Sequence, residues 1–148
     1  MFLILLGILT TLSLPPFNYF FINFLTFTFF FLYLDKKSKE HNDKFSFFTY
    51  GWLFGFGYFF TNLYWISISL TFDQNYKFLI PLTVILIPSF LAIFYGLVSF
   101  LFLIYKPKKI ISSLILFSLI FGILEFIRGS ILTGFPWNLI AFSFSNQL

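Results

Sequence analysis

The chain has 148 residues, of which 59% are hydrophobic and only 9% are charged, compared with roughly 25% charged residues in a soluble domain. This composition excludes a soluble domain of ordinary size and predicts an integral membrane protein made of spans and short loops. In a membrane protein, basic residues indicate which loops face the cytoplasm. We therefore do not interpret the net charge of +4 as a sign of nucleic-acid binding. The absence of cysteine excludes disulfides, thiolate nucleophiles and cysteine-ligated metals.

Two membrane spans are expected before the first charged residue. Residues 1–34 carry no charge, and a single helix of that length would be about 51 Å long, whereas the hydrocarbon core is about 30 Å thick. Pro15 and Pro16 break this segment, because proline removes a helical donor and restricts the residue before it. The first span therefore covers about 1–14 and the second about 17–34. We do not expect a signal peptide, because a charged n-region and a small-residue cleavage site are both missing.

The only strongly polar run, 35–44, reads D-K-K-S-K-E-H-N-D-K and holds four of the nine basic residues. We interpret this run as a solvated loop. The lone histidine, His41, lies inside it and is interpreted as a surface residue instead of a metal ligand.

The third uncharged run, 45–72, carries an aromatic pair near its end, Tyr64 and Trp65, which is typical of the membrane interface. Its first half contains three glycines: Gly51, Gly55 and Gly57. The first two form a G-x-x-x-G pattern, which predicts close packing against a neighbouring helix. A short polar loop with one acid and one base follows at 73–77.

A fourth span is predicted at 78–105, where Pro88 is expected to kink the helix without ending it. The basic stretch 106–109 stops this span, and a fifth span follows at about 110–127. Residues 129–148 are uncharged but rich in turn formers, so we expect a loop and then the start of a sixth apolar segment.

The basic residues are distributed unevenly among the loops. The loops after the second and fourth spans hold seven of the nine, whereas Lys77 and Arg128 follow the third and fifth spans. The positive-inside rule places both lysine-rich loops in the cytoplasm, and span counting also puts them on one side. The predicted fold class is therefore all-α, a polytopic transmembrane helical bundle of five spans plus the start of a sixth, with a cytoplasmic N-terminus.

Glu125 and Arg128 are an acid and a base three residues apart at the end of the fifth span, so they are neighbours on one face of a helix. Inserting an ionised side chain at membrane depth costs about 2.5 to 3.5 kcal/mol of free energy on insertion scales. Two charged residues at this position therefore require a structural or functional explanation. Two interpretations remain open. The pair is either a salt-bridged helix end at the interface or part of a polar site at the membrane surface.

The residue types contain no complete active site. Ser130 lies in R-G-S-I-L, which is not a nucleophile elbow, and it has no partner base. The single histidine and the five acidic residues are scattered and give no pair of metal ligands at helical spacing. Phosphate-binding and dinucleotide-binding glycine patterns in a strand-to-helix context are also missing, so we expect no metal and no cofactor.

Three stretches, in the same order and with similar loop placement, resemble the N-terminal membrane region of apolipoprotein N-acyltransferase. They are L-S-L-P-P-F at 12–17, G-W-L-F-G-F-G-Y-F-F-T-N-L-Y-W-I at 51–66 and E-F-I-R-G-S-I-L-T-G-F-P-W-N-L at 125–139. The last stretch is the most specific. The chain departs from the family at 141–143, where A-F-S replaces a Gly-Tyr-Ser-like sequence.

The resemblance implies a multi-pass enzyme of the bacterial inner membrane that transfers an acyl chain from a phospholipid to the N-terminal diacylglyceryl-cysteine amine of a lipoprotein. In that family a nitrilase-like domain with a Glu, Lys and Cys triad performs the chemistry, and residues 1–148 contain no counterpart of it. We therefore expect this chain to be the N-terminal transmembrane domain, as a fragment or truncated product that is inactive alone. The implied partners are membrane phospholipid, the lipoprotein substrate and the nitrilase-like domain.

The resemblance also implies which side chains contact lipid or dock the catalytic domain, none of them in a covalent role: Glu125, Arg128, Trp137 and Asn138, with Tyr64 and Trp65 behind them. Two alternatives remain open. One is a non-catalytic membrane scaffold or carrier subunit that packs through its glycines. The other is the membrane half of a split acyltransferase.

Overall fold

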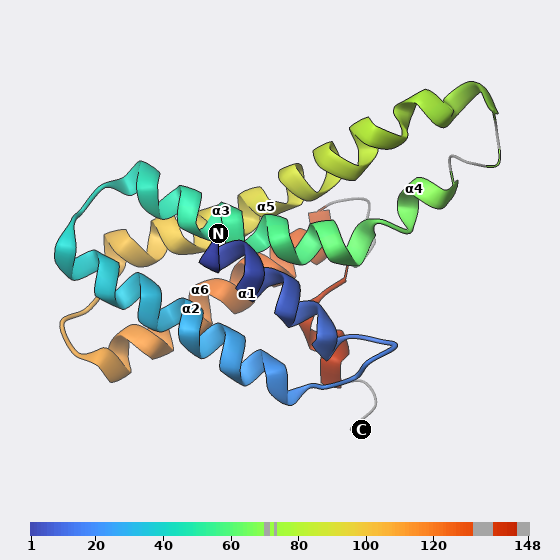
Figure 1. Cartoon of the computed structure of the whole chain (residues 1–148). Helices are drawn as coiled ribbons and strands as arrows, with labels where there is room; N and C mark the ends of the chain where they lie inside the picture. The colour runs from blue at the N-terminus through green and yellow to red at the C-terminus, as the bar shows by residue number, and fades with distance from the viewer. Residues whose placement is uncertain (70–71, 73, 132–137, 145–148) are drawn as a thin grey trace.

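The computed structural model describes residues 1–69, 72, 74–131 and 138–144, and every regular element in this part of the chain is helical. The α-helices are α1 (Phe2–Thr10), α2 (Phe21–Glu40), α3 (Lys44–Leu63), α4 (Ile66–Ser69), α5 (Ile80–Tyr105) and α6 (Ile110–Ile131). Shorter 3-10 helices are η1 (Thr11–Ser13), η2 (Gln74–Leu79) and η3 (Ile140–Phe144). In Figure 1, α3 lies alongside α5, α1 packs against α3 and α2, and α6 packs against α5.

Two stretches of the described chain are long and apolar enough to cross a membrane, by length and composition. They are Lys77–Tyr105, with a mean hydropathy of 2.4, and Ile110–Ile131, with a mean hydropathy of 2.5. α1 and η1 together form a shorter apolar stretch, Phe2–Ser13. The expected all-α class is thus confirmed for the described residues, while five membrane crossings remain a prediction.

The first break in the helices lies where the two prolines predict it. η1 ends at Ser13, and Leu14 is extended. α2 begins only at Phe21, four residues later than expected. Asn18 has a φ of 57°, a left-handed conformation that asparagine adopts more readily than most residues. The turn therefore extends well beyond the prolines and uses Asn18 to reverse the chain.

The polar run 35–44 is mostly helical, so its interpretation as a loop is wrong. α2 continues through it to Glu40. Ion pairs at helical spacing explain this extension: Lys39 Nζ lies 2.6 Å from a carboxylate oxygen of Asp35, and Lys37 Nζ lies 2.6 Å from one of Glu40. Each acid pairs with a lysine one turn away on the same helix, so the charges stabilise the helix instead of ending it.

Asp35 also connects the end of α2 to the end of α5. Its second carboxylate oxygen lies 2.6 Å from Nζ of Lys106, which directly follows α5. The Asp35 side chain is only 7% exposed, so this is a partly desolvated link between two helices that are distant in sequence. The link could not be foreseen from hydropathy, because nothing in the sequence pairs 35 with 106.

The turn between α2 and α3 contains His41 and Asp43. His41 is partly buried, with Nε2 3.3 Å from the hydroxyl oxygen of Tyr50. The Asp43 carboxylate accepts from the backbone N–H groups of Phe45 and Ser46, as an N-cap of α3 does. Hydrogen bonds from the Ser46 hydroxyl and its backbone N–H hold the pKa of Asp43 below its usual value. This cap fixes where α3 begins.

α3 ends at Leu63, although the uncharged run of the sequence continues to Phe72. Thr61 and Asn62 donate side-chain hydrogen bonds to the carbonyl groups four residues earlier, over 2.9 and 3.0 Å. Such bonds compete with the backbone ladder near a helix end, which explains the early stop. α5, in contrast, continues through Pro88 as one helix.

α3 packs backbone to backbone against its neighbours at its glycines. A Cβ atom on Gly51 would lie 2.0 Å from the carbonyl oxygen of Tyr95 on α5, and one on Gly55 would lie 2.8 Å from Tyr95 Cβ. On the α1 side, a Cβ atom on Gly57 would lie 2.3 Å from the carbonyl oxygen of Ile4. The missing side chains therefore allow α3 to lie between α1 and α5 at close distance.

Aromatic rings fill the space among α2, α3, α5 and α6. Phe30 of α2 stacks on Phe54 of α3 with ring centroids 4.3 Å apart. Phe27 of α2 meets Phe121 of α6 edge-on at 4.8 Å, and Tyr95 of α5 meets Phe121 at 5.1 Å. These contacts fix the relative positions of the four helices, since aromatic pairs add directional attraction to their buried area.

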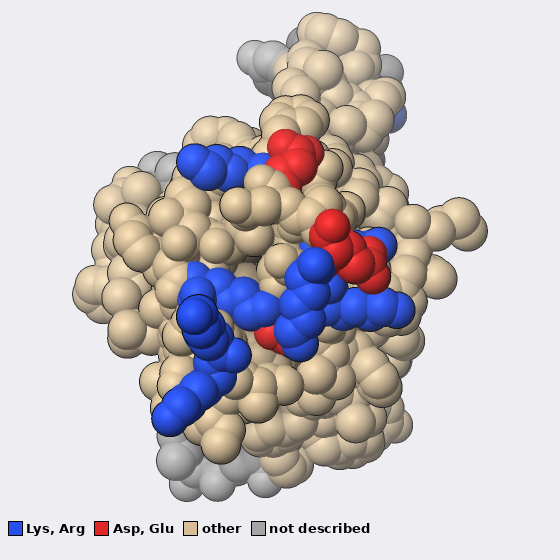
Figure 2. Space-filling model, turned by 90° about the vertical axis from the view of Figure 1, so that its left-hand side faces the viewer, with Lys and Arg blue, Asp and Glu red and all other residues tan. Residues whose placement is uncertain are grey.

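The lysines gather at one end of the bundle, where α2 turns into α3 and α5 turns into α6 (Figure 2). The members of this lysine end are Lys36, Lys37, Lys39, Lys44, Lys106, Lys108 and Lys109. α3 runs from this end to the opposite one, so the two ends of the bundle differ strongly in charge.

Replacing Gly51 with alanine should lower the free energy of unfolding by about 1 to 3 kcal/mol, because the new Cβ would clash with the α5 backbone. Gly122→Ala is the matched control. Nothing lies within 4 Å of a Cβ at that position, so helix propensity should raise stability by up to about 1 kcal/mol. Equilibrium unfolding in mixed detergent micelles measures both variants, and equal effects would contradict the close contact.

Candidate functional site

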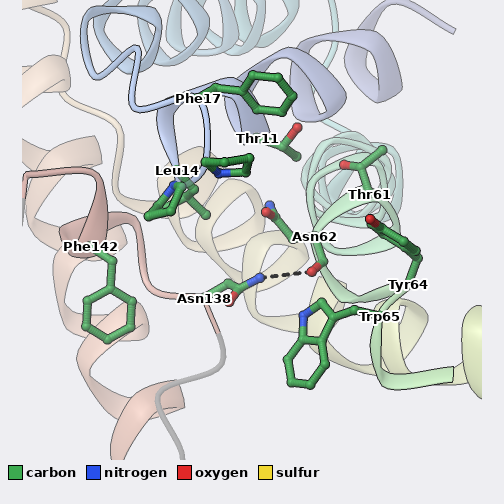
Figure 3. Close-up of a pocket in the computed structure, with 11 residues that line it drawn as sticks. Thr11, Leu14, Phe17, Thr61, Asn62, Tyr64, Trp65, Asn138 and Phe142 are labelled. Atoms are coloured by element: carbon green, nitrogen blue, oxygen red, sulfur yellow. Dashed lines mark hydrogen bonds between the residues drawn. The ribbon is translucent and has the colours of Figure 1, made fainter. Parts of the chain in front are cut away.

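A cavity of about 600 Å³ opens at the end of the bundle opposite the lysine end. Three separate segments form its walls: the turn after η1, the end of α3, and the chain at and just before η3 (Figure 3). The lining residues are Thr11, Leu14, Pro15, Pro16, Phe17, Thr61, Asn62, Tyr64, Trp65, Asn138 and Phe142. Nine of the eleven lining residues belong to the three stretches that carry the family resemblance, while Thr11 directly precedes the first stretch and Phe142 lies three residues after the last.

The cavity combines polar groups with apolar walls. Asn138 Nδ2 donates to the backbone carbonyl oxygen of Asn62 over 3.2 Å, the dashed line in Figure 3. Tyr64 and Trp65 are 61% and 48% exposed, so they lie at the rim. Leu14 and the prolines form the facing wall. An arrangement with a few placed polar groups in apolar surroundings suits a ligand that has a polar head and an apolar body.

Tyr58 holds Asn138 in position from the interior of the bundle. The Tyr58 hydroxyl donates to the Asn138 carbonyl oxygen over 2.7 Å, and Tyr58 is fully buried on α3. Asn138 has a φ of 41°, a left-handed conformation that asparagine tolerates better than most residues. The backbone bond to α3 therefore sets where the Asn138 side chain enters the cavity.

Glu125 and Arg128 form an ion pair outside the cavity lining. Arg128 Nη2 and Nε lie 2.8 and 3.1 Å from Glu125 Oε1. Arg128 is fully buried, and its guanidinium carbon lies 4.9 Å from the ring centroid of Phe59 on α3. The other carboxylate oxygen of Glu125 accepts from the backbone N–H of Ile140 over 3.1 Å. The pair thus joins α6 to α3 and to the start of η3.

The ion pair does not stand at a helix end, as the sequence led us to expect. α6 continues to Ile131, one turn beyond the predicted end at Ile127. Because the partners of both charges lie inside the bundle, the helix does not need to stop for water to reach them. Gly129 to Ile131, expected in a loop, are therefore helical, and residues 132–137 of that expected loop lie outside the described part of the chain.

The structure brings together only some of the side chains named from the resemblance. Tyr64, Trp65 and Asn138 line the cavity, whereas Glu125 and Arg128 support the segment that leads into η3. Trp137, the remaining side chain named from the resemblance, lies outside the described residues.

Sequence reasoning did not single out Asn62 and Tyr58, which position Asn138 in the site. Asn62 lines the cavity, and Tyr58 anchors the Asn138 backbone. Both residues lie in the second of the three resembling stretches. A polar amide and a phenol inside an uncharged run are the only sequence features that could have pointed to them. Their partners are 76 and 80 residues away, which local pattern alone does not reveal.

The described part of the site provides groups that bind and orient a molecule. Its lining contains amides, hydroxyls and aromatic rings, and no described lining residue is a carboxylate, a lysine or a histidine. Within the described residues no group of three or more histidine, cysteine or acidic side chains could hold a metal ion. The chemistry available there is hydrogen bonding combined with apolar contact.

Comparison with known proteins gives matches along nearly the whole chain. The family model for the apolipoprotein N-acyltransferase N-terminal domain matches residues 6–148. An apolipoprotein N-acyltransferase of Rhizobium rhizogenes is 38% identical over 146 residues, which cover 94% of this chain and 27% of that protein. The enzyme of that name from Rickettsia prowazekii is 39% identical over 144 residues, covering 96% and 27%. No solved structure matches. The chain spans about a quarter of the length of these relatives.

Removing one partner of the ion pair should destabilise the protein more than removing both. Glu125→Gln or Arg128→Gln leaves a poorly solvated charge, with an expected cost of about 3 to 5 kcal/mol, whereas the double substitution leaves none. Unfolding and protease resistance of the purified chain measure the three variants, with Ser130→Ala on the exposed side of α6 as the control. Effects that simply add would mean that the two charges do not interact.

Proposed function

Because the chain belongs to the apolipoprotein N-acyltransferase N-terminal domain family, we propose that it is the membrane domain of an enzyme that matures bacterial lipoproteins. This enzyme transfers an acyl chain from a phospholipid to the N-terminal diacylglyceryl-cysteine amine of a lipoprotein in the inner membrane. A nitrilase-like catalytic domain performs the chemistry. Residues 1–148 bind and orient the lipid and dock that domain.

The convergence of three separate stretches on one cavity is the observation that carries this proposal. The amide of Asn138 offers hydrogen bonds to the polar part of a phospholipid, and Leu14 and Phe17 contact the first carbons of its chains. Tyr64 and Trp65 at the rim suit the membrane interface, where amphipathic rings are favoured. The cavity therefore presents the acyl donor at the surface of the membrane.

The proposed topology follows from the charge difference between the ends of the bundle. The lysine end faces the cytoplasm by the positive-inside rule, and the cavity faces outward. Five segments then cross the membrane: α1 with η1, α2, α3, α5 and α6. This orientation places the cavity on the side where lipoprotein substrates and the catalytic domain meet.

Single cysteine probes test this topology, since the chain contains no cysteine of its own. A membrane-impermeant maleimide should label Phe72→Cys in intact spheroplasts, because Phe72 is exposed and lies beyond α4, away from the lysine end. It should label Lys108→Cys only after the membrane is permeabilised. The reverse pattern would overturn the orientation and the outward position of the cavity.

The proposed role of the cavity is tested in a chimera in which residues 1–148 replace the matching region of the Rhizobium rhizogenes enzyme. We expect the chimera to acylate a diacylated lipopeptide. Trp65→Ala should raise KM for phospholipid roughly tenfold with little change in kcat, because a docking contact acts equally on the bound lipid and the transition state. Leu119→Ala, on the exposed face of α6, is the matched control.

The chain alone should show no turnover in the same assay, because it has no cysteine to form a thioester. Turnover above a no-protein control would overturn this division of labour. A folded chimera without activity would contradict the assignment and favour a non-catalytic scaffold.

A further inference from the structure

A groove of about 330 Å³ lies at the lysine end of the bundle, between the start of α3 and the second half of α5. Lys44, Phe45 and Phe48 of α3 form one wall, and Leu97 and Phe100 of α5 form the other. Residues three or four positions apart share one face of a helix, so both walls follow the helix axes. The groove is therefore an apolar channel whose lining contains a single charged side chain, that of Lys44.

The walls of this groove favour a hydrocarbon chain as the occupant. α5 belongs to the stretch Lys77–Tyr105, which is long and apolar enough to cross a membrane. Phe45 is 78% exposed, and contact with hydrocarbon would remove its ring from water. Phe48 packs on the α5 backbone, since a Cβ atom on Gly96 would lie 2.7 Å from its ring. The groove is thus a defined gap between two packed helices, with a surface that suits an acyl chain.

Lys44 brings a positive charge to the groove that the described part of the protein does not neutralise by an ion pair. Three other lysines of this end each pair with a carboxylate of α2, whereas Lys44 has no such partner among the described residues. The neighbouring carboxylate of Asp43 accepts instead from the backbone of Phe45 and from Ser46, as the N-cap of α3. A lysine stem lies along apolar surface while its ammonium group stays in water. The Lys44 charge therefore lies where the polar head of a lipid in the groove would lie.

Charge complementarity selects among membrane lipids. The phosphate of phosphatidylcholine or phosphatidylethanolamine is balanced by a cationic group of the same head, whereas phosphatidylglycerol carries a net negative charge. We propose that the groove binds an anionic phospholipid, with its phosphate paired with the Lys44 ammonium group and one acyl chain lying along Phe48 and Phe100.

The surroundings of the groove add to this preference. The seven lysines of the lysine end outnumber its acidic residues, Asp35, Glu40 and Asp43 (Figure 2). Basic residues near a membrane surface attract anionic lipids in this way. The groove lies at the end of the bundle opposite the cavity, so this is a lipid site separate from the one proposed for the acyl donor. A lipid seated there would touch both α3 and α5, and binding only to the packed helices would stabilise their contact.

Photo-crosslinking of the 148-residue chain in phosphatidylcholine nanodiscs tests the proposal. The probes are phosphatidylglycerol and phosphatidylcholine that carry the same diazirine-labelled acyl chain, each added at the same low fraction. Crosslinks to residues 44–48 and 97–100 should be roughly fivefold more abundant with phosphatidylglycerol, as expected for one charge pair at a membrane surface. At the exposed Leu119 of α6 the two probes should react equally.

Salt separates the charge pair from the apolar contact. At 1 M salt, where the screening length is about 3 Å, the preference for phosphatidylglycerol in the groove should fall toward one while crosslinking itself persists. Equal yields of the two probes in the groove at low salt would overturn the proposal.

Variants checked for helix content locate the charge. Lys44→Gln should bring the ratio of the two probes to about one, whereas Lys44→Arg should keep it near fivefold. Lys36→Gln is the matched control, because Lys36 is an exposed lysine of the same end that does not line the groove. A preference that survives in Lys44→Gln, or is lost equally in Lys36→Gln, would contradict a specific pair with Lys44.

A bulky residue locates the chain. Leu97→Trp should remove the groove crosslinks of both probes, whereas Leu86→Trp, on the exposed surface of the same helix, should preserve them. Unchanged crosslinks in Leu97→Trp would overturn the proposal. So would a disulfide between two Phe45→Cys chains that excludes both probes, since a second copy would then occupy the groove. The readout needs neither acyl transfer nor a known orientation, so its failure is distinct from failure of the proposed function.

Discussion

The backbone contact of α3 with α1 and α5 is the constraint on which the rest of the structure depends. No side chain separates Gly51 from the Tyr95 carbonyl or Gly57 from the Ile4 carbonyl. In a membrane, helices gain little from the hydrophobic effect on meeting one another, so close van der Waals packing must hold them together. The same contact brings the end of α3 against the proline turn, and the cavity is a consequence of that position.

Buried polar groups then fix the segment that completes the cavity. Both charges of the Glu125 and Arg128 pair have protein partners, and one of these partners is the backbone at the start of η3. The Tyr58 hydroxyl holds the Asn138 carbonyl from the other side. In a medium of low dielectric constant such bonds are strong when complete and costly when broken. The chain around η3 is therefore positioned by α3 and α6 together.

Hydropathy and turn chemistry predicted the helical class, the break near Pro15 and the separation of charge between the two ends. They failed where contacts between distant segments decide the outcome. Asp35 stays in a helix because Lys39 and Lys106 neutralise its charge. Lys106 is too distant in the sequence for a local pattern to pair it with Asp35. The early end of α3 depends on side-chain bonds from Thr61 and Asn62 that hydropathy does not register. The family resemblance named Tyr64, Trp65 and Asn138, but only the fold showed that they share one cavity.

η3 is a single short element with a hollow on each side. Phe142 lines the cavity, whereas Phe144 lines a hollow of about 240 Å³ between α2 and α6, and Ser143 Oγ accepts a hydrogen bond from Asn23. These three residues lie within one turn of 3-10 helix, so a displacement of η3 changes both hollows at once. Thermodynamic linkage then makes the coupling reciprocal: a molecule that shifts η3 from one side alters affinity on the other side by the same factor in both directions. Occupancy of one hollow would thus change the residence time of a molecule bound in the other.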